Sequence, residues 1–285
     1  MKTIKNTTFP QERALYAEKD VYLENCSFDG IEDGESALKE ARDITVRNCF
    51  FNLRYPFWHN ENVTITDSAM TDKCRAALWY SNGINISSSS LSGIKALREC
   101  ADITITETKI NSPEFGWKNR NITASDCDIE GEYPFFMSKG ITCTNLTLRG
   151  KYSFQYTENV EITDSVFDTK DAFWHSKDVT IKNSLIKGEY LAWYSEDLTL
   201  DHCKIIGTQP LCYCKNLTLI DCETEDADLA FEYSDVNAVI KGEILSVKNP
   251  RSGKIVADRI GEIIVTDDSV YECTCDISQT SRKIR

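Results

Sequence analysis

The sequence that decides the fold is NVEITDSVF at residues 159–167, which recurs as DVTIKNSLI at 178–186 and as DLTLDHCKI at 197–205. In each copy aliphatic residues alternate with polar or β-branched ones, which is the pattern of a half-buried strand. The residue before the first aliphatic residue is Asn or Asp, as a tight turn requires. We therefore interpret the 19-residue interval as one structural repeat.

The same interval extends along most of the chain, and every step from Ile84 to Val236 repeats it. The step from Val21 to Ile44 is longer, with its excess around residues 31–34, and so is the step from Val63 to Ile84, with its excess near residues 71–73. We interpret both excesses as short loops. With the first aliphatic residue of each repeat as position zero, the repeats begin at Lys2, Val21, Ile44, Val63, Ile84, Ile103, Ile122, Ile141, Val160, Val179, Leu198, Leu217 and Val236.

A short unit with several apolar positions can bury them only against copies of itself, so equivalent residues should stack about 4.8 Å apart. This predicts an all-β fold, a single-stranded right-handed parallel β-helix of about thirteen coils. A left-handed β-helix is the alternative, but its apolar residues recur about every six residues; here they fall at positions zero, two, five, seven and thirteen. We expect the β-helix to span residues 1–240. Residues 241–285, where the pattern is lost, should form cap strands and a polar tail of the same domain.

Charge and composition exclude several classes of partner. The net charge is −13 and the sequence pI is about 4.8. Such a surface repels phosphate backbones, so we expect no nucleic acid, and it disfavours polyanionic polysaccharides unless a local basic patch overrides the field. Neither an 18-residue apolar run nor a secretory signal is visible, so we expect no membrane contact. Twelve cysteines without an export signal predict reduced thiols in the cytoplasm.

Two columns just ahead of position zero carry the chemically informative residues. All five tryptophans lie five residues before position zero, in a column that also holds Lys39, Arg98 and Gln155. We interpret this column as outward-facing. The tryptophans could instead fill the interior, but Arg98 would then need a buried partner. The inward column lies six residues before position zero and holds Leu38, Phe57, Leu78, Leu97, Phe135, Phe154, Phe173 and Leu211.

Two clusters of side chains in and beside these columns form the candidate site. The first holds three candidate catalytic residues, Glu99 as acid or base with Arg98 and His59, and the candidate ligand-binding residues Trp58, Arg75, Trp79, Tyr80, Glu114 and Trp117. The second holds the candidate ligand-binding residues Tyr156, Asp171, Trp174, His175, Glu189, Trp193 and Tyr194. His59 and His175 lie six coils apart and cannot share a metal ion, so we expect neither metal nor cofactor.

Several phrases resemble one known family: LRYPFWH at 53–59, CRAALWY at 74–80, GIKALREC at 93–100 and KDAFWH at 170–175. The chain is similar over roughly residues 1–240 to a bacterial family of pectin-lyase-like right-handed parallel β-helix proteins known only as a domain of unknown function. The resemblance implies that fold and no particular activity. The aspartate clusters, calcium sites and catalytic arginines of the wider pectin-lyase-like group have no matching positions in this sequence, so none is carried over.

Two kinds of function remain open. Aromatic side chains stack on sugar rings while charged groups bond the hydroxyls, which favours a carbohydrate ligand. The protein is then a carbohydrate-active enzyme, similar to a lyase, hydrolase or epimerase, that acts through its aromatic and charged stripe. Alternatively, it is a non-catalytic β-helix that binds a glycan or a protein, and the stripe can also join copies into a homo-oligomer.

Overall fold

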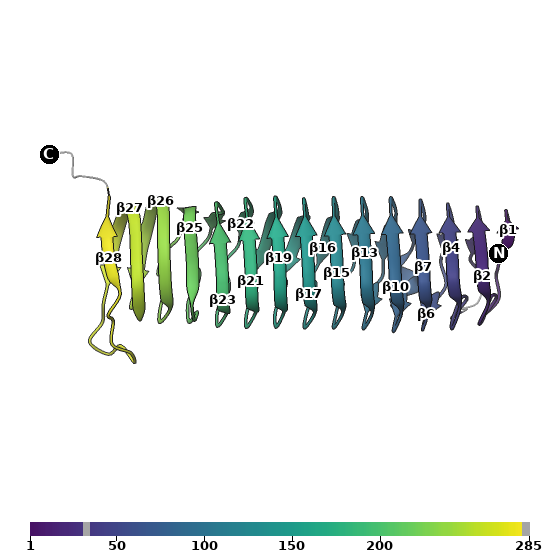
Figure 1. Cartoon of the computed structure of the whole chain (residues 1–285), viewed down its shortest axis with the longest axis horizontal. Coiled ribbons are helices and arrows are strands. Elements are labelled where there is room, and N and C mark those ends of the chain that lie inside the picture. Colours follow the sequence, from purple (N-terminus) through teal and green to yellow (C-terminus); the bar gives the residue numbers. More distant parts are fainter. Residues whose placement is uncertain (31–34, 281–285) are drawn as a thin grey trace. The chain divides into compact units, whose positions relative to one another are not determined.

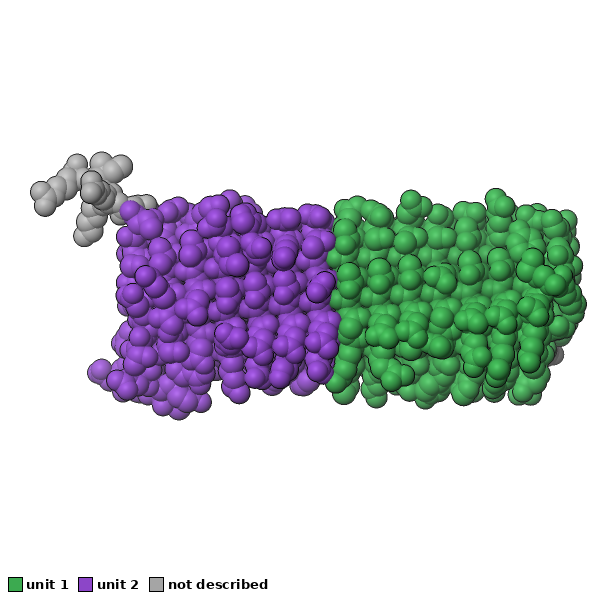
Figure 2. Space-filling model, viewed as in Figure 1, with its two compact units in different colours: residues 1–147 green, residues 148–285 purple. Residues whose placement is uncertain are grey.

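The computed structural model describes residues 1–30 and 35–280, which form two compact units, residues 1–147 and residues 148–285 (Figure 2). Each unit is a right-handed parallel β-helix, as the repeat predicted, with its strands side by side in Figure 1. The loop expected at residues 31–34 lies outside the described residues. Within the described ranges, no helix is long and apolar enough to cross a membrane.

Unit 1 has three strand faces. The first face contains β1 (Lys2–Lys5), β2 (Lys19–Glu24), β4 (Arg42–Arg47), β7 (Glu61–Thr66), β10 (Asn82–Ser87), β13 (Ala101–Thr106), β15 (Arg120–Ser125) and β17 (Lys139–Thr144). The second contains β3 (Ser27–Phe28), β5 (Phe50–Phe51), β8 (Ala69–Met70), β11 (Ser90–Ser92), β14 (Lys109–Asn111) and β16 (Asp128–Gly131). The third is short, with β6 (Phe57–Trp58), β9 (Leu78–Trp79) and β12 (Leu97–Arg98).

Unit 2 repeats the first two faces. Its first face contains β19 (Glu158–Thr163), β21 (Lys177–Lys182), β23 (Glu196–Asp201), β25 (Leu217–Glu225), β26 (Asp235–Lys248), β27 (Ser252–Ile264) and β28 (Asp276–Gln279). Its second face contains β20 (Val166–Lys170), β22 (Leu185–Lys187) and β24 (Lys204–Ile206). A further strand, β18, runs from Thr147 to Lys151 and so begins at the last residue of unit 1.

The strand register confirms that the repeat interval is the coil length. Ile84 pairs with Ile103 in unit 1, and Val160 pairs with Val179 in unit 2. From Asp20 to Asn216, the residue before position zero is left-handed in every coil, with φ of 56° at Asn62. Asparagine tolerates this conformation, and its side-chain amide donates a 2.9 Å hydrogen bond to Asp43 Oδ1 one coil away. The Asn and Asp residues before position zero therefore shape the turn and join neighbouring coils.

The column six residues before position zero is the interior, as predicted. All eight of its named side chains are fully buried, and Phe154 stacks on Phe173 with ring centroids 4.8 Å apart. In the next column, five residues before position zero, all five tryptophans are half-buried.

The prediction that this next column faces outward is wrong at three positions of unit 2. Gln155, Cys212 and Phe231 are only 8%, 0% and 1% exposed. Strand alternation does not apply at this corner, where the residues on either side of Gln155 have φ near 57°. Gln155 Nε2 donates to the carbonyl oxygen of Asp171 at 3.0 Å, and the Cys212 thiol contacts backbone carbonyls, so both side chains can be buried with partners.

Parallel pairing continues beyond residue 240, although the regular repeat interval does not. Val236 pairs with Gly253, a shorter step than in the preceding coils, and Lys254 pairs with Asp276, a longer one. The strands also lengthen, because β26 has 14 residues and β27 has 13. A change of period, rather than a change of fold, therefore ends the visible repeat.

Candidate functional site

The tryptophans of unit 1 lie in register because their strands pair in parallel. Trp58 of β6 pairs with Trp79 of β9, which pairs with Arg98 of β12. The indoles of Trp58 and Trp79 stack with centroids 5.4 Å apart and planes 12° apart. Lys39 Nζ lies 3.9 Å from the Trp58 ring centroid and so caps this stack with a cation–π contact.

Arg98 interrupts the column and gathers two carboxylates. Its Nε donates to Glu99 Oε1 at 3.0 Å, and its Nη1 lies 3.7 Å from Glu114 Oε2. The guanidinium also lies over the Trp117 ring, 5.5 Å from the centroid. The predicted grouping of Arg98, Glu99, Glu114 and Trp117 is therefore present in space.

A hollow of about 270 Å³ lies beside this arginine. We call it the basic hollow; the side chains of its wall that matter here are Tyr55, Arg75, Trp79, Ile94, Lys95 and Arg98. Its volume is slightly below the ~300–1,000 Å³ typical of ligand pockets, so it fits at most one small ring or headgroup. Two aromatic rings and three cationic side chains meet in this wall.

The longer coil, the one that begins at Val63, contributes Arg75 and Trp79 to this wall. Its extra residues form a 3₁₀ turn just before Arg75, η1 (Asp72–Cys74), where the sequence predicted a short loop. After it, Arg75 adopts φ 54° and ψ −88°, which turns the chain back toward the strand face. Gly93 lies against the backbone of Arg75, where a Cβ would meet the Arg75 oxygen at 2.8 Å, so only glycine fits this approach. Lys95 N donates to that same oxygen at 2.9 Å. This hydrogen bond holds the backbones of Arg75 and Lys95 side by side.

A second hollow, of about 480 Å³, lies beside Tyr80 and Glu99, the residues that follow Trp79 and Arg98 in the chain. We call it the polar hollow; its wall includes Tyr80, Glu99, Asp102, Arg120 and Asn121. Consecutive residues therefore serve different hollows, since Trp79 and Arg98 line the first while Tyr80 and Glu99 line the second. Hydrogen bonding to the Glu99 carboxylate raises the pKa of the Tyr80 hydroxyl, so these two side chains meet.

Two tryptophans of this site lack the hydrogen bond that the others make. The indole N–H donates to a backbone carbonyl of the next coil at 2.8 Å in Trp117, 2.7 Å in Trp174 and 2.8 Å in Trp193. The buried N–H groups of Trp58 and Trp79 have no acceptor among the described residues. A buried donor without a partner costs about 1–3 kcal/mol, so this part of unit 1 is less stable than fully bonded tryptophans would make it.

His59 lies at the edge of this cluster. Its Nδ1 is 3.8 Å from Glu40 Oε1, and its ring meets Tyr80 edge-on at 5.2 Å. It lines neither hollow. The structure therefore brings His59 to Tyr80 and not to the Arg98–Glu99 pair.

The predicted residues of unit 2 form stacked ladders. Tyr156, His175, Tyr194 and Tyr213 stack in series with centroids 4.9, 5.0 and 4.7 Å apart and planes within 11°. Trp174 and Trp193 stack at 5.3 Å and 4°. Because the inner rings cover each other's faces, this surface presents mainly ring edges to solvent.

The acidic residues of the second cluster differ in their surroundings. Glu189 Oε2 is exposed and pairs with Lys170 Nζ at 3.0 Å. Asp171 is buried, and burial raises the pKa of its carboxyl group. Neither Asp171 nor Glu189 lines the basic hollow or the polar hollow.

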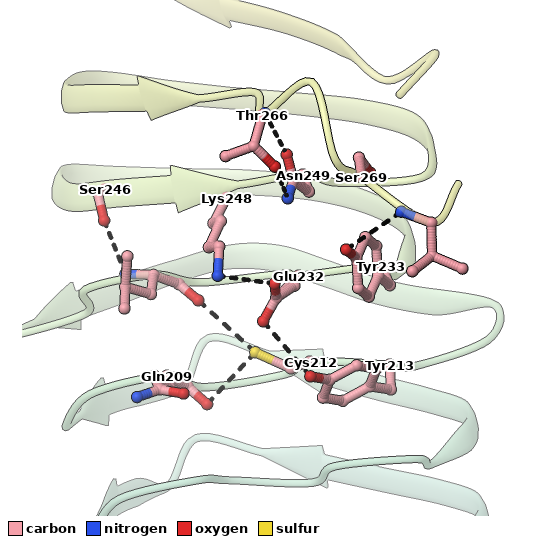
Figure 3. Close-up of polar contacts among 12 residues, drawn as sticks. Gln209, Cys212, Tyr213, Glu232, Tyr233, Ser246, Lys248, Asn249, Thr266 and Ser269 are labelled. Atoms are coloured by element: carbon pink, nitrogen blue, oxygen red, sulfur yellow. Dashed lines mark hydrogen bonds and ion pairs between the residues drawn. The ribbon is translucent and has the colours of Figure 1, made fainter. Parts of the chain in front are cut away.

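The tyrosine ladder leads to a carboxylate that the prediction omitted. Figure 3 shows Glu232 between Tyr213 and Lys248; the Tyr213 hydroxyl donates to Glu232 Oε2 at 3.4 Å, and Lys248 Nζ lies 2.9 Å from Oε1. Burial, with a further contribution from this carboxylate, raises the pKa of Tyr213 to about 12. Glu232 lies in the same column as Tyr213, one coil later. This shared column is the sequence feature from which its place beside Tyr213 could have been predicted.

Tyr55 and Lys95 were also missed. Tyr55 lies eight residues before position zero, and the same column holds Tyr133 and Tyr190, each of which meets a tryptophan edge-on. This recurring tyrosine marks a partner of the tryptophan column. Lys95 belongs to no recurring column of lysines, so the sequence carried no comparable signal for it.

Among the described residues, no group of three or more His, Cys, Asp or Glu side chains is arranged to hold a metal ion.

Solved structures similar to this chain share little sequence with it. PfbA, a surface adhesin of Streptococcus pneumoniae, is 9% identical with a TM-score of 0.48, over 86% of this chain and 84% of PfbA. The A-module of the mannuronan C-5 epimerase AlgE4 of Azotobacter vinelandii is 11% identical (TM-score 0.31; 96% and 88% covered). An endo-xylogalacturonan hydrolase of Aspergillus tubingensis is 12% identical (TM-score 0.35; 96% and 87% covered).

A search of curated proteins finds no similar sequence. A family profile described as "Protein of unknown function (DUF3737)" matches residues 2–278, nearly the whole length. The chain therefore belongs to the DUF3737 family, which agrees with the resemblance seen in its repeat phrases.

Proposed function

We propose that the protein binds a glycan, with one sugar unit in the basic hollow of unit 1. The observation that carries this proposal is the composition of the wall, in which Tyr55 and Trp79 adjoin Arg75, Lys95 and Arg98. Aromatic rings contact the apolar C–H faces of a sugar, while fixed cations and N–H groups donate to its oxygens.

The polar hollow supports a second subsite. It adjoins the basic hollow through the consecutive pairs Trp79–Tyr80 and Arg98–Glu99. Its carboxylates and amide offer acceptors as well as donors, which suits the hydroxyl groups of a neighbouring sugar. A ligand of two or more linked sugars would therefore bind more tightly than a single one.

Binding is tested by calorimetric titration with a panel of neutral and acidic mono- and oligosaccharides. The panel contains glucose, galactose and mannose series, each with its uronate and its 6-sulfate. We expect Trp79→Ala to weaken binding at least tenfold, because it removes an aromatic side chain from the wall of the hollow. The matched control is Trp174→Ala in unit 2, which should leave the affinity unchanged.

Thermal unfolding of both variants verifies that each still folds. If no member of the panel binds, or if Trp174→Ala weakens binding as much as Trp79→Ala does, the proposal is wrong.

A catalytic function is the second candidate, favoured by the position of Glu99. Its carboxylate contacts the Arg98 guanidinium and the Tyr80 hydroxyl at the border of the two hollows. A carboxylate at this position is a suitable residue type for a general base. Product analysis after incubation with each bound sugar separates the candidates: turnover that disappears in Glu99→Gln supports catalysis, and an absence of product in the wild type leaves binding alone.

A further inference from the structure

We infer that the basic hollow selects a sugar bearing an oxyanion, a carboxylate or a sulfate, over its neutral counterpart. This inference rests on the proposed glycan binding and adds the class of ligand. Its basis is the excess of hydrogen-bond donors over acceptors in the wall.

Three cationic side chains line the basic hollow, and no carboxylate of the described residues does. The nearest carboxylates already serve two of these cations. Lys95 Nζ lies 3.5 Å from Glu114 Oε2, and Arg98 contacts both Glu114 and Glu99. The three cationic side chains therefore have only two neighbouring carboxylates, which leaves one net positive charge at the hollow.

Arg75 is the cation that supplies this difference. It is exposed, it lines the hollow, and it has no ion-pair partner among the residues that the structure describes. Its backbone is held by the turn after η1 and by the 2.9 Å hydrogen bond from Lys95 N to its carbonyl. A guanidinium offers five N–H donors in a fork that matches a carboxylate or a sulfate. A neutral hydroxyl uses this group less well.

The charge of the whole chain makes this feature unusual. A net charge of −13 creates a field that repels anions, which disfavoured acidic polysaccharides at the level of composition. Exposed charges are screened beyond about 10 Å at 0.1 M salt, so at the hollow the adjacent cations outweigh the more distant acidic groups. Attraction for an oxyanion should therefore be confined to the basic hollow and should weaken as salt increases.

The test compares matched sugars within the same panel. For each hexose the probes are the methyl glycoside, the methyl glycoside of its uronate and the methyl glycoside 6-sulfate, titrated at about 50 and about 300 mM salt. For the hexose that binds, we expect the anionic forms to bind about tenfold more tightly at low salt, equivalent to about 1.4 kcal/mol. High salt should reduce this preference and leave the neutral sugar unaffected. Comparison of the uronate with the sulfate identifies the anion.

Arg75→Gln removes the unpaired charge and keeps a side chain of similar length. It should abolish the preference for anionic sugars and retain binding of the neutral one. Lys73→Gln removes the same charge from a neighbouring residue outside the hollow and should preserve the preference. Equal affinity for neutral and anionic sugars, or an unchanged preference in Arg75→Gln, would overturn the inference while leaving glycan binding intact. If no probe binds, the proposed function fails, and this inference fails with it.

Discussion

At the scale of single residues, Asp171 is the clearest case of an unfavourable charge. Its side chain sits at a left-handed corner with φ of 54° and is only 6% exposed. Burial raises the pKa of its carboxyl group above the usual value, Glu189 raises it further, and Lys170 opposes the shift. A carboxyl group whose pKa is raised on folding destabilises the native state when it is ionised.

We predict that Asp171→Asn increases the free energy of unfolding at neutral pH. Asparagine tolerates the left-handed corner and carries no charge to desolvate. The gain in unfolding free energy should be complete above the folded-state pKa of Asp171. It should disappear as the pH falls toward the unfolded-state pKa, because Asp171 of the native protein is then protonated and neutral. Urea unfolding at pH 7.5, 5.5 and 4.5 measures this dependence.

The control for that prediction is Asp168→Asn. Asp168 is exposed and forms a surface ion pair with Lys187 at 3.0 Å, so its replacement should change stability little. A gain in Asp171→Asn that does not depend on pH would contradict the assignment of the effect to a buried charge.

At the scale of structural elements, the stacked interior column determines which substitutions the coils tolerate. Phe173 is fully buried, stacks on Phe154 with planes 3° apart, and meets Phe167 edge-on. Each coil buries its apolar residues against its neighbours, so a lost ring leaves a cavity that the rigid stack cannot close.

We predict that Phe173→Ala lowers the free energy of unfolding by about 3–5 kcal/mol. Val166→Ala is the matched control, because Val166 is 44% exposed on the neighbouring strand β20 and should cost less than about 0.5 kcal/mol. Both values come from urea unfolding. Similar losses in the two variants would show that Phe173 does not lie in a packed interior.

The coil register was predictable from sequence, whereas the hollows were not. The strands that begin near Val160 and Val179 pair as the spacing required, and Trp174 stacks on Trp193 at 5.3 Å. Repetition makes this possible, because one residue type recurs wherever one environment recurs. The basic hollow follows the irregular turn η1, and its residues come from several columns, so no single column could indicate that Arg75 and Lys95 meet there.

The direction of side chains at corners was also beyond the sequence pattern. Alternation predicts direction along extended strands, but the corner residues have positive φ, as Phe154 and Tyr156 do. Residue type alone does not decide burial there. Gln155 and Trp174 each donate to a backbone carbonyl, yet Gln155 is buried and Trp174 is half-buried.

At the scale of the whole molecule, the chain is acidic and built of repeated coils. Among the described residues, the wall of the basic hollow combines aromatic rings with an unpaired arginine. The regular coils supply a fixed frame, and the longer coil that begins at Val63 supplies the departure from it. Regular ladders occupy their own hydrogen-bond donors, as Trp117, Trp174 and Trp193 do. The indole donors of Trp58 and Trp79, in two neighbouring coils of unit 1, have no acceptor among the described residues.

The most direct test is the ¹H–¹⁵N spectrum of the indole groups during titration with the tightest-binding sugar of the panel. The five tryptophans give five indole signals, assigned by single Trp→Phe variants. We predict that the Trp79 signal moves with the dissociation constant measured by calorimetry, while the signals of Trp174 and Trp193 stay in place. A stationary Trp79 signal, or movement confined to Trp174 and Trp193, would contradict binding at the basic hollow.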